Sequence, residues 1–304
     1  SGTFAVDGTV ITRVEGRHQL TDKGSAIEAK GDGEFQRFVP EKLRPLLSGK
    51  TVFDIAGTAT KAGGVIVERA TVESNALRGS ASGSIDPEGA SDFALEAAAT
   101  GDGVLLSFGS EESPIDMVVK SATVRALGAG NEPNLDISAV MGRVSTNSAA
   151  IDNLSVTLHS DAFNIAARTG PVTGQATAAA LTIDNPTVAP LVAGKISAGF
   201  AGTLKTDALT VTEGSLSSDA LNGAFDGEVS LANGAIRLDI EADVASAALP
   251  AAVRPALAER VELSARFLRD TEGHVSADPF SLASGALAAK GTIRSADEKI
   301  DATI

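Results

Sequence analysis

The chain contains no cysteine, tryptophan or tyrosine, and phenylalanine is its only aromatic residue type. The absence of cysteine excludes disulfides and thiolate metal sites, although it leaves the redox compartment open. A formal net charge of −14 disfavours nucleic acids and anionic bilayer surfaces as partners, because both require lysine and arginine to neutralise their own negative charge. No apolar run reaches the roughly 18 residues of a membrane-spanning helix, so we expect none in this segment.

Small residues and a two-residue periodicity dominate what is present. The 304 residues include 31 glycines, and 43% of the residues are hydrophobic, which indicates a sheet packed with small side chains. From Leu221 to Leu231 every second residue is apolar or glycine, while the intervening residues are small or polar. This alternation predicts a strand with one apolar face and one polar face.

The same sequence frame occurs more than once. The frame at 218–231 recurs at 74–85, in a shorter form at 284–293, and as a weaker echo at 160–165. Internal repetition of this kind decides the architecture, because each copy is one structural unit of an array.

A short proline-containing stretch precedes each of the three clearer frames, at 38–47, 185–194 and 250–257. Proline near the start and glycine beyond the end are typical of a short helix. The distance from the proline to the leucine of the following frame is nearly constant: 32 residues from Pro45 to Leu77, 31 from Pro190 to Leu221, and 32 from Pro255 to Leu287. The sequence therefore predicts a unit made of a short helix followed by several strands.

These units give the predicted organisation of the chain. The expected segments are 1–37 (strands that end a preceding unit), 38–110 (first full unit), 111–184 (a degenerate unit), 185–249 (third unit) and 250–304 (fourth unit, truncated). In the degenerate unit we expect the helix to be missing or replaced by the loop at 128–133. Short turn sequences join consecutive strands, which indicates antiparallel neighbours. The predicted fold class is all-β: a long curled antiparallel sheet, or β-taco, with short proline-containing helices at the unit boundaries.

The predicted helices are too few and too short to cover the apolar face of such a sheet. Two arrangements remain, an ordinary closed β core or a curled groove lined with apolar side chains. Five glycines on the apolar face are expected to let the strands bend: Gly79, Gly83, Gly223, Gly227 and Gly291. The large side chains expected to line a groove are Phe53, Ile55, Leu77, Ile85, Phe93, Leu95, Phe163, Phe200, Leu221, Phe225, Val229, Leu238, Ile240, Leu263, Leu287 and Ile293.

The sequence offers little support for catalysis. His18, His159 and His274 are far apart in the chain and lie among polar residues. The acidic stretches at 32–34 and 101–103 lack the ligand spacing of a calcium loop, and we interpret them as turns. No glycine-rich phosphate loop is present. We therefore expect no catalytic residue, no metal site and no cofactor.

The proline-containing helices with their following strands, at 39–60, 187–204 and 252–267, and the SxALxGxxxGxI/V frames at 74–85 and 218–229 resemble the AsmA-like superfamily, in particular its TamB-like proteins. These are inner-membrane-anchored subunits of the translocation and assembly module. The resemblance implies an internal periplasmic segment of a long protein whose apolar groove carries phospholipid between the inner and outer membranes of a Gram-negative bacterium.

The same resemblance implies a supporting role in outer-membrane protein assembly. The implied partners are phospholipid acyl chains and, for the full-length protein, an outer-membrane barrel of the BamA type. It transfers no catalytic residue. Two alternative functions remain open from the sequence: a scaffold that pairs with nascent outer-membrane strands by β-augmentation, and a closed β-solenoid adhesin or passenger domain.

Overall fold

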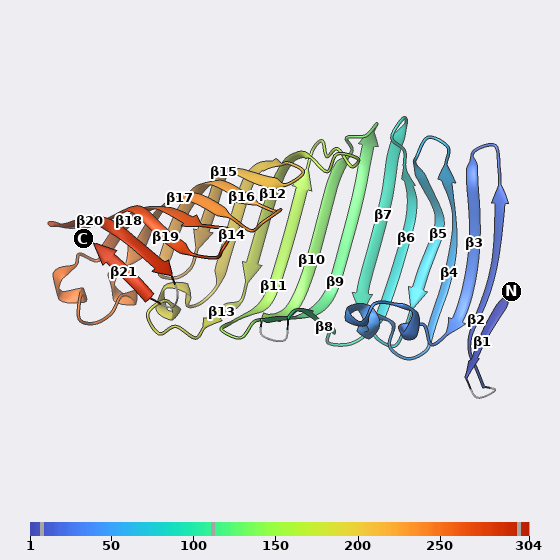
Figure 1. Ribbon diagram of the computed structural model, residues 1–304, viewed down its shortest axis with the longest axis horizontal. Helices are drawn as coiled ribbons and strands as arrows, with labels where there is room; N and C mark the ends of the chain where they lie inside the picture. The colour runs from blue at the N-terminus through green and yellow to red at the C-terminus, as the bar shows by residue number, and fades with distance from the viewer. Residues whose placement is uncertain (7–8, 111–112, 297–298, 304) are drawn as a thin grey trace. The chain divides into compact units, whose positions relative to one another are not determined.

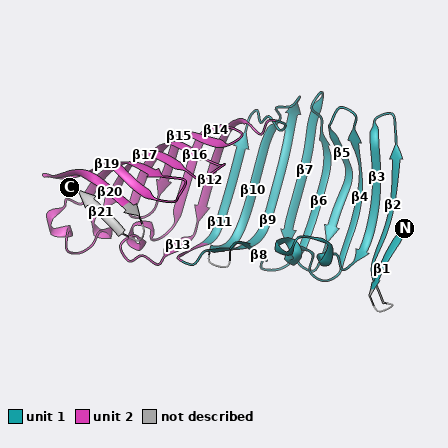
Figure 2. Ribbon diagram, viewed as in Figure 1, with its two compact units in different colours: residues 1–147, 152–166 teal, residues 148–151, 167–304 magenta. Residues whose placement is uncertain are grey.

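The computed structural model describes residues 1–6, 9–110, 113–296 and 299–303, and it confirms the all-β prediction (Figure 1). The chain divides into two compact units, each described here by itself (Figure 2). Unit 1 comprises residues 1–147 and 152–166, and unit 2 comprises residues 148–151 and 167–304. Strand β11 (Ala149–Ser160) contributes to both.

Unit 1 is an antiparallel sheet in which consecutive strands pair side by side (Figure 2). Its other strands are β1 (Gly2–Val6), β2 (Thr9–Leu20), β3 (Gly24–Gly33), β4 (Thr51–Thr60), β5 (Val65–Glu73), β6 (Leu77–Ile85), β7 (Ala90–Ala99), β8 (Val104–Gly109), β9 (Pro114–Ala129) and β10 (Asn134–Ser145). The long strand β9 pairs with β8 along its first half and with β7 along its second half. β10 pairs with the other side of β9.

Unit 2 continues the same pattern of antiparallel neighbours. Its strands are β12 (Gly170–Ala178), β13 (Ala180–Ile183), β14 (Ile196–Leu204), β15 (Ala208–Ser217), β16 (Leu221–Ser230), β17 (Ile236–Ala245), β18 (Arg260–Arg269), β19 (Val275–Ser284), β20 (Leu287–Ala296) and β21 (Lys299–Thr303). β12 pairs with β14, and from β14 to β21 each strand pairs with the next.

The proline-containing helices lie where the sequence places them, but they are short 3₁₀ segments. Those with a proline are η2 (Glu41–Leu47), η3 (Ala189–Val192) and η5 (Arg254–Ala256), and two further 3₁₀ segments without proline, η1 (Gln36–Phe38) and η4 (Ser246–Ala248), precede η2 and η5. Pro45 lies inside η2, while Pro190 and Pro255 lie at the first turns of η3 and η5. A proline lacks the N–H that an α-helix requires in its interior, so these stretches end after about one or two turns.

The loop at 128–133 does not replace a helix. The N–H of Gly130 donates to the carbonyl of Gly89, which places this loop beside the β6–β7 turn, at the edge of the sheet opposite η2. Strand β8 instead lies against η2, and its Val104 and Leu106 are buried. Strand β8 therefore occupies the position where the other sequence repeats have a short helix.

A β-bulge occurs at the same place in the three sequence repeats that have the clearer frames. In β5, β15 and β19 two consecutive residues face one residue of the next strand. The bulged pairs are Glu68–Arg69, Thr212–Glu213 and Asp278–Pro279, and each pair begins nine residues before the leucine of its frame. A bulge bends its strand and increases the local twist. The repeat is therefore structural as well as sequential.

Candidate functional site: the open apolar faces

In unit 2, three rows of residues run across the middle of one face of the sheet, from β12 to β20. The first row is Gly174, Phe200, Gly214, Phe225, Ile240, Ala265, Phe280 and Gly291; the second is Val172, Gly202, Val211, Gly227, Leu238, Phe267, Ala277 and Ile293; the third is Ala176, Ala198, Leu216, Gly223, Ala242, Leu263, Leu282 and Ala289. Every member is apolar or glycine, as the two-residue period requires.

Unit 1 has three corresponding rows, from β2 to β10. They are Val14, Gly31, Phe53, Val72, Gly79, Ala97, Ala122 and Ala139; then Gly16, Ala29, Ile55, Ala70, Ala81, Leu95, Val124 and Ile137; then His18, Ile27, Gly57, Val67, Gly83, Phe93, Ala126 and Leu135. His18 is the single polar member, and its Nε2 lies 2.6 Å from the hydroxyl of Ser25. We call these six rows the middle rows.

Most of the side chains predicted to line a groove belong to the middle rows. They are Phe53, Ile55, Phe93 and Leu95 in unit 1, and Phe200, Phe225, Leu238, Ile240, Leu263 and Ile293 in unit 2. The structure therefore gathers these predicted lining residues onto one apolar face per unit.

The other predicted lining residues lie at the margins of these faces. Leu77, Leu221 and Leu287 begin strands β6, β16 and β20, in the row nearest the helices. Ile85 and Val229 lie near the opposite ends of β6 and β16. Phe163 is not in a strand: it follows β11, and its N–H donates to the carbonyl of Pro133 over 3.0 Å. The frame at 160–165 is thus not equivalent to the other three.

The glycines on the apolar face serve two purposes, and bending is only one of them. Gly83 and Gly227 have φ of 103° and 143° and lie next to the residues that face the bulges, so they agree with the expected role in curvature. Gly79 and Gly223 do not have a left-handed backbone. Along a row, glycine instead gives room to a large neighbour, as Gly214 does for the ring of Phe225.

The middle rows are only partly covered. Phe53, Phe225 and Ile240 are half-buried, and Ile55 is exposed. Because apolar atoms remain within reach of solvent, these faces do not form an ordinary closed core.

The two margins of each face differ strongly in burial. Near the helices, Thr51 of unit 1 is 1% exposed, and Ala178 and Val244 of unit 2 are 6% and 0% exposed. Near the opposite turns, Leu20 of unit 1 is 79% exposed and Leu209 of unit 2 is half-buried. We call these margins the helix edge and the turn edge. The apolar face is thus more deeply covered along the helix edge than along the turn edge.

The other face of each sheet is polar and carries most of the ion pairs. Asp54 accepts Arg69 at 2.8 Å and Lys30 at 3.3 Å. The hydrogen bond from Arg69 is the largest cause that lowers the pKa of the Asp54 carboxyl. In unit 2, Arg266 pairs with Asp239 at 2.8 Å. Cross-strand pairs like these stabilise a solvated face by small amounts.

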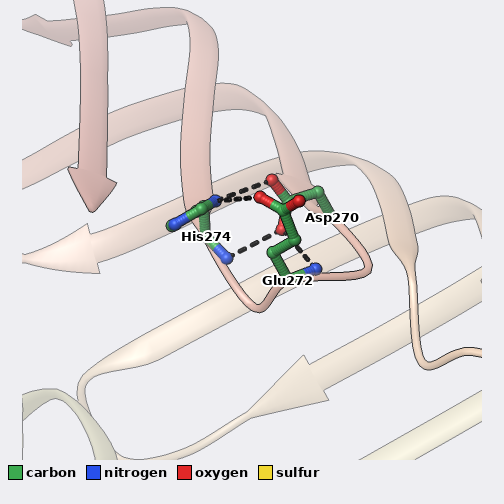
Figure 3. A group of neighbouring side chains, drawn as sticks. All are labelled: Asp270, Glu272 and His274. Atoms are coloured by element: carbon green, nitrogen blue, oxygen red, sulfur yellow. Dashed lines mark hydrogen bonds and ion pairs between the residues drawn. The ribbon is translucent and has the colours of Figure 1, made fainter. Parts of the chain in front are cut away.

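A group of potential metal ligands lies in the turn between β18 and β19 (Figure 3). The ligand atoms of Asp270, Glu272 and His274 lie within 4.8 Å of one another. Asp270 already accepts the N–H groups of Glu272 and His274, both at 2.9 Å, and its other oxygen lies 3.0 Å from His274 Nδ1. These bonds close the turn, which accounts for the cluster without an ion.

No family model, no curated protein and no solved structure matches the chain. Within the described residues, no helix has both the length and the apolar character needed to cross a membrane. The functional argument therefore depends on the apolar faces themselves.

Proposed function

We propose that the apolar face of each unit is a non-enzymatic binding surface for phospholipid acyl chains, in a protein that carries lipid between two membranes. The observation that carries the proposal is the combination of continuity and exposure. Across unit 2 the middle rows contain no polar side chain, yet their larger members remain within reach of solvent. A surface of this kind is costly to leave in water unless an apolar ligand covers it.

The chemistry of an acyl chain suits such a surface. Each buried methylene contributes about 0.8 kcal/mol, so covering half of a sixteen-carbon chain would contribute about 6 kcal/mol. The middle rows offer no hydrogen-bond donor that would hold a chain at one position, His18 excepted. Binding without polar anchors lets a chain slide along the strands' common face, which a conduit requires.

The resemblance to the AsmA-like superfamily supports the cellular part of the proposal. On this basis the chain is a periplasmic segment of an inner-membrane-anchored protein that supplies phospholipid to the outer membrane and supports assembly there. An outer-membrane barrel of the BamA type would be a partner of the whole protein.

Site-specific photocrosslinking tests the proposal directly. A photoreactive residue at Phe225 or Ile240 should capture phospholipid in cells. The matched controls are Ala224 and Glu241, the exposed residues that precede and follow them on the polar face. Lipid should also co-purify with the chain and be identified by mass spectrometry. Equal capture from both faces, or capture only of polypeptide, would exclude a lipid surface, and the latter result would favour β-augmentation.

A further inference from the structure

In each of the three clearer sequence frames, the first serine contacts the backbone at the end of, or just after, the short helix of the same repeat. Ser74 Oγ donates to the carbonyl of Leu46 over 2.7 Å, and Ser218 Oγ donates to the carbonyl of Leu191 over 2.7 Å. Leu46 and Leu191 are the residues that follow Pro45 and Pro190. The same hydrogen bond therefore joins η2 to the β5–β6 turn and η3 to the β15–β16 turn.

The same serines also hold their own turns. Ser218 Oγ accepts the N–H groups of Ala220 and Leu221 at 3.2 and 3.1 Å. Ser74 does the same for Ala76 and Leu77, at 3.1 and 2.9 Å. One hydroxyl thus uses both its donor and its acceptor capacity, and it ties the start of the frame strand to the end of the helix.

The last sequence repeat, residues 250–304, makes a variant of this contact. Ser284 Oγ accepts the N–H of Ala258 at 2.8 Å and donates to the carbonyl of Arg260 at 3.1 Å. Ala258 lies between η5 and β18, and Arg260 is the first residue of β18. By contrast Ser160, whose frame lies at the turn edge and has no helix, is 2% exposed, and its hydroxyl has no hydrogen-bond partner among the described residues.

A second feature marks the same junctions. Gly49 and Gly194 follow their prolines by four residues and have φ of 72° and 82°. The side chains of Asn75 and Asp219, each directly after the serine, occupy the space that a Cβ at these glycines would need. In the last sequence repeat the glycine lies in the strand turn and not after the helix: Gly285 directly follows Ser284 and has φ of 60°.

We propose that Ser74, Ser218 and Ser284 are latches that seal the helix edge of the apolar face. An acyl chain on the middle rows would then enter and leave only past the turn edge. The difference in burial between the two edges supports this role, because in unit 2 Ala178 and Val244 near the latched segments are almost inaccessible, while Leu209 near the opposite turns is half-buried. η2 and η3 themselves contain no buried residue, so they depend on contacts with their neighbours, among them the serine hydrogen bond and, for η2, strand β8. This proposal rests on the proposed lipid function, although the seal can be tested without lipid.

Because the chain contains no cysteine, a single introduced cysteine is the only thiol, and its reaction rate reports on that position alone. Ala178→Cys places a thiol beside Ile196, the first residue of the strand that follows η3. Val211→Cys places one at a buried position of a middle row, 5% exposed and away from the helix edge. Reaction with an aromatic disulfide reagent measures how often each position becomes accessible.

If Ser218 is a latch, adding Ser218→Ala to the Ala178→Cys chain should accelerate the thiol reaction by about tenfold, since it removes the hydroxyl's hydrogen bonds. The same substitution should leave the reaction of the Val211→Cys chain unchanged. Ser218→Thr retains a hydroxyl and should restore slow reaction in the Ala178→Cys chain. An unchanged rate in that chain, or equal acceleration in both chains, would overturn the proposal, because the latter shows only a general loss of stability.

A lipid measurement completes the test. Release of a fluorescent phospholipid from the Ser218→Ala chain should be several-fold faster than from the unmodified chain, and Ser218→Thr should reverse the change. If the unmodified chain binds no phospholipid, the proposed lipid function fails while the thiol rates still decide whether the serine seals the edge. If lipid binds but is released at equal rates from all three chains, the sealing role for the ligand is wrong.

Discussion

The ring of Phe53 lies across the backbone of Gly31 in the neighbouring strand. A Cβ at Gly31 would come within 2.5 Å of Cε1 and 2.7 Å of Cζ of that ring. Phe225 lies across Gly214 in the same way. A phenylalanine on the apolar face thus covers the backbone of a residue that has no side chain of its own. At these two places a large residue and a glycine stand side by side in a row for this reason.

Substitution of these glycines by alanine should be destabilising because the added Cβ would overlap the ring and force it away from the backbone that it covers. For Gly31→Ala and Gly214→Ala we expect a loss of about 1–3 kcal/mol in the free energy of unfolding. Gly223→Ala is the matched control, since its Cβ would meet the carbonyl of Glu241 at an ordinary 3.4 Å, and its effect should stay within about 0.5 kcal/mol. Urea denaturation followed by circular dichroism measures both. Equal effects in the two classes would show that the rings are free to move aside.

The glycine next to a bulge should tolerate alanine even less. Gly227 has φ of 143°, and a Cβ there would strike the carbonyl of Arg237, so Gly227→Ala combines backbone strain with a close contact. We expect it to cost about 2–3 kcal/mol. Gly63 has φ of 83° but no atom within 4 Å of the added Cβ. Gly63→Ala therefore measures only the cost of the left-handed backbone, about 1 kcal/mol in the free energy of unfolding. The same denaturation experiment compares them, and the prediction fails if the two substitutions cost the same.

The repeat could be predicted from the sequence because its parts obey local rules. Alternation indicated the strands, and the distance from Pro45 to Leu77 and from Pro190 to Leu221 revealed the unit. The structure explains that distance: the residue after the proline must reach the serine three positions before the leucine, as the bond from Ser74 to Leu46 shows. The physical cause of the spacing, a hydrogen bond between distant segments, is invisible in composition.

The bulges had a sequence signal that the strand assignment does not use. In β15 the apolar positions Leu209 and Val211 are followed by Gly214 and Leu216, so the alternation shifts by one residue. The same shift separates Val67 from Ala70. Phe163 shows the opposite problem. Its frame resembles the others locally, but no proline-containing helix precedes it at the required distance, and it lies in a loop at the turn edge.

A histidine outside the apolar faces makes stability depend on pH. His159 lies between Asp136, 2.7 Å from Nδ1, and Asp161, 2.9 Å from Nε2. The hydrogen bond to Asp136 is the largest cause that raises the pKa of His159, and the hydrogen bond to Asp161 is the next largest. Because the folded pKa exceeds the unfolded value of about 6.5, the stabilisation is fully present below that pH and is lost as pH rises through the folded pKa.

His159→Gln should therefore lower the unfolding free energy more at about pH 5.5 than at about pH 8.5, since glutamine cannot become charged. Denaturation curves of both chains at the two pH values give the difference. His18→Gln is a useful control, because His18 contacts only a serine hydroxyl among its described hydrogen-bonding partners. A His159→Gln effect that is the same at both pH values would show that the imidazole does not hold its proton between the two carboxylates.

A charge in a middle row should abolish lipid binding more than it disturbs the fold. Ala242 lies between Gly223 and Leu263 on the apolar face, so Ala242→Glu would place a carboxylate beneath any bound acyl chain. Burial of an unpaired charge against hydrocarbon is costly, and we expect the affinity for a fluorescent phospholipid to fall at least about tenfold. Because the face is open to solvent when empty, the carboxylate can stay hydrated in the free protein, and the melting temperature should change little. Ser215→Glu adds the same charge at an exposed position of the polar face and should leave lipid binding unchanged. Equal loss of binding in the two variants would mean that the net charge of the chain, and not the apolar face, governs the interaction.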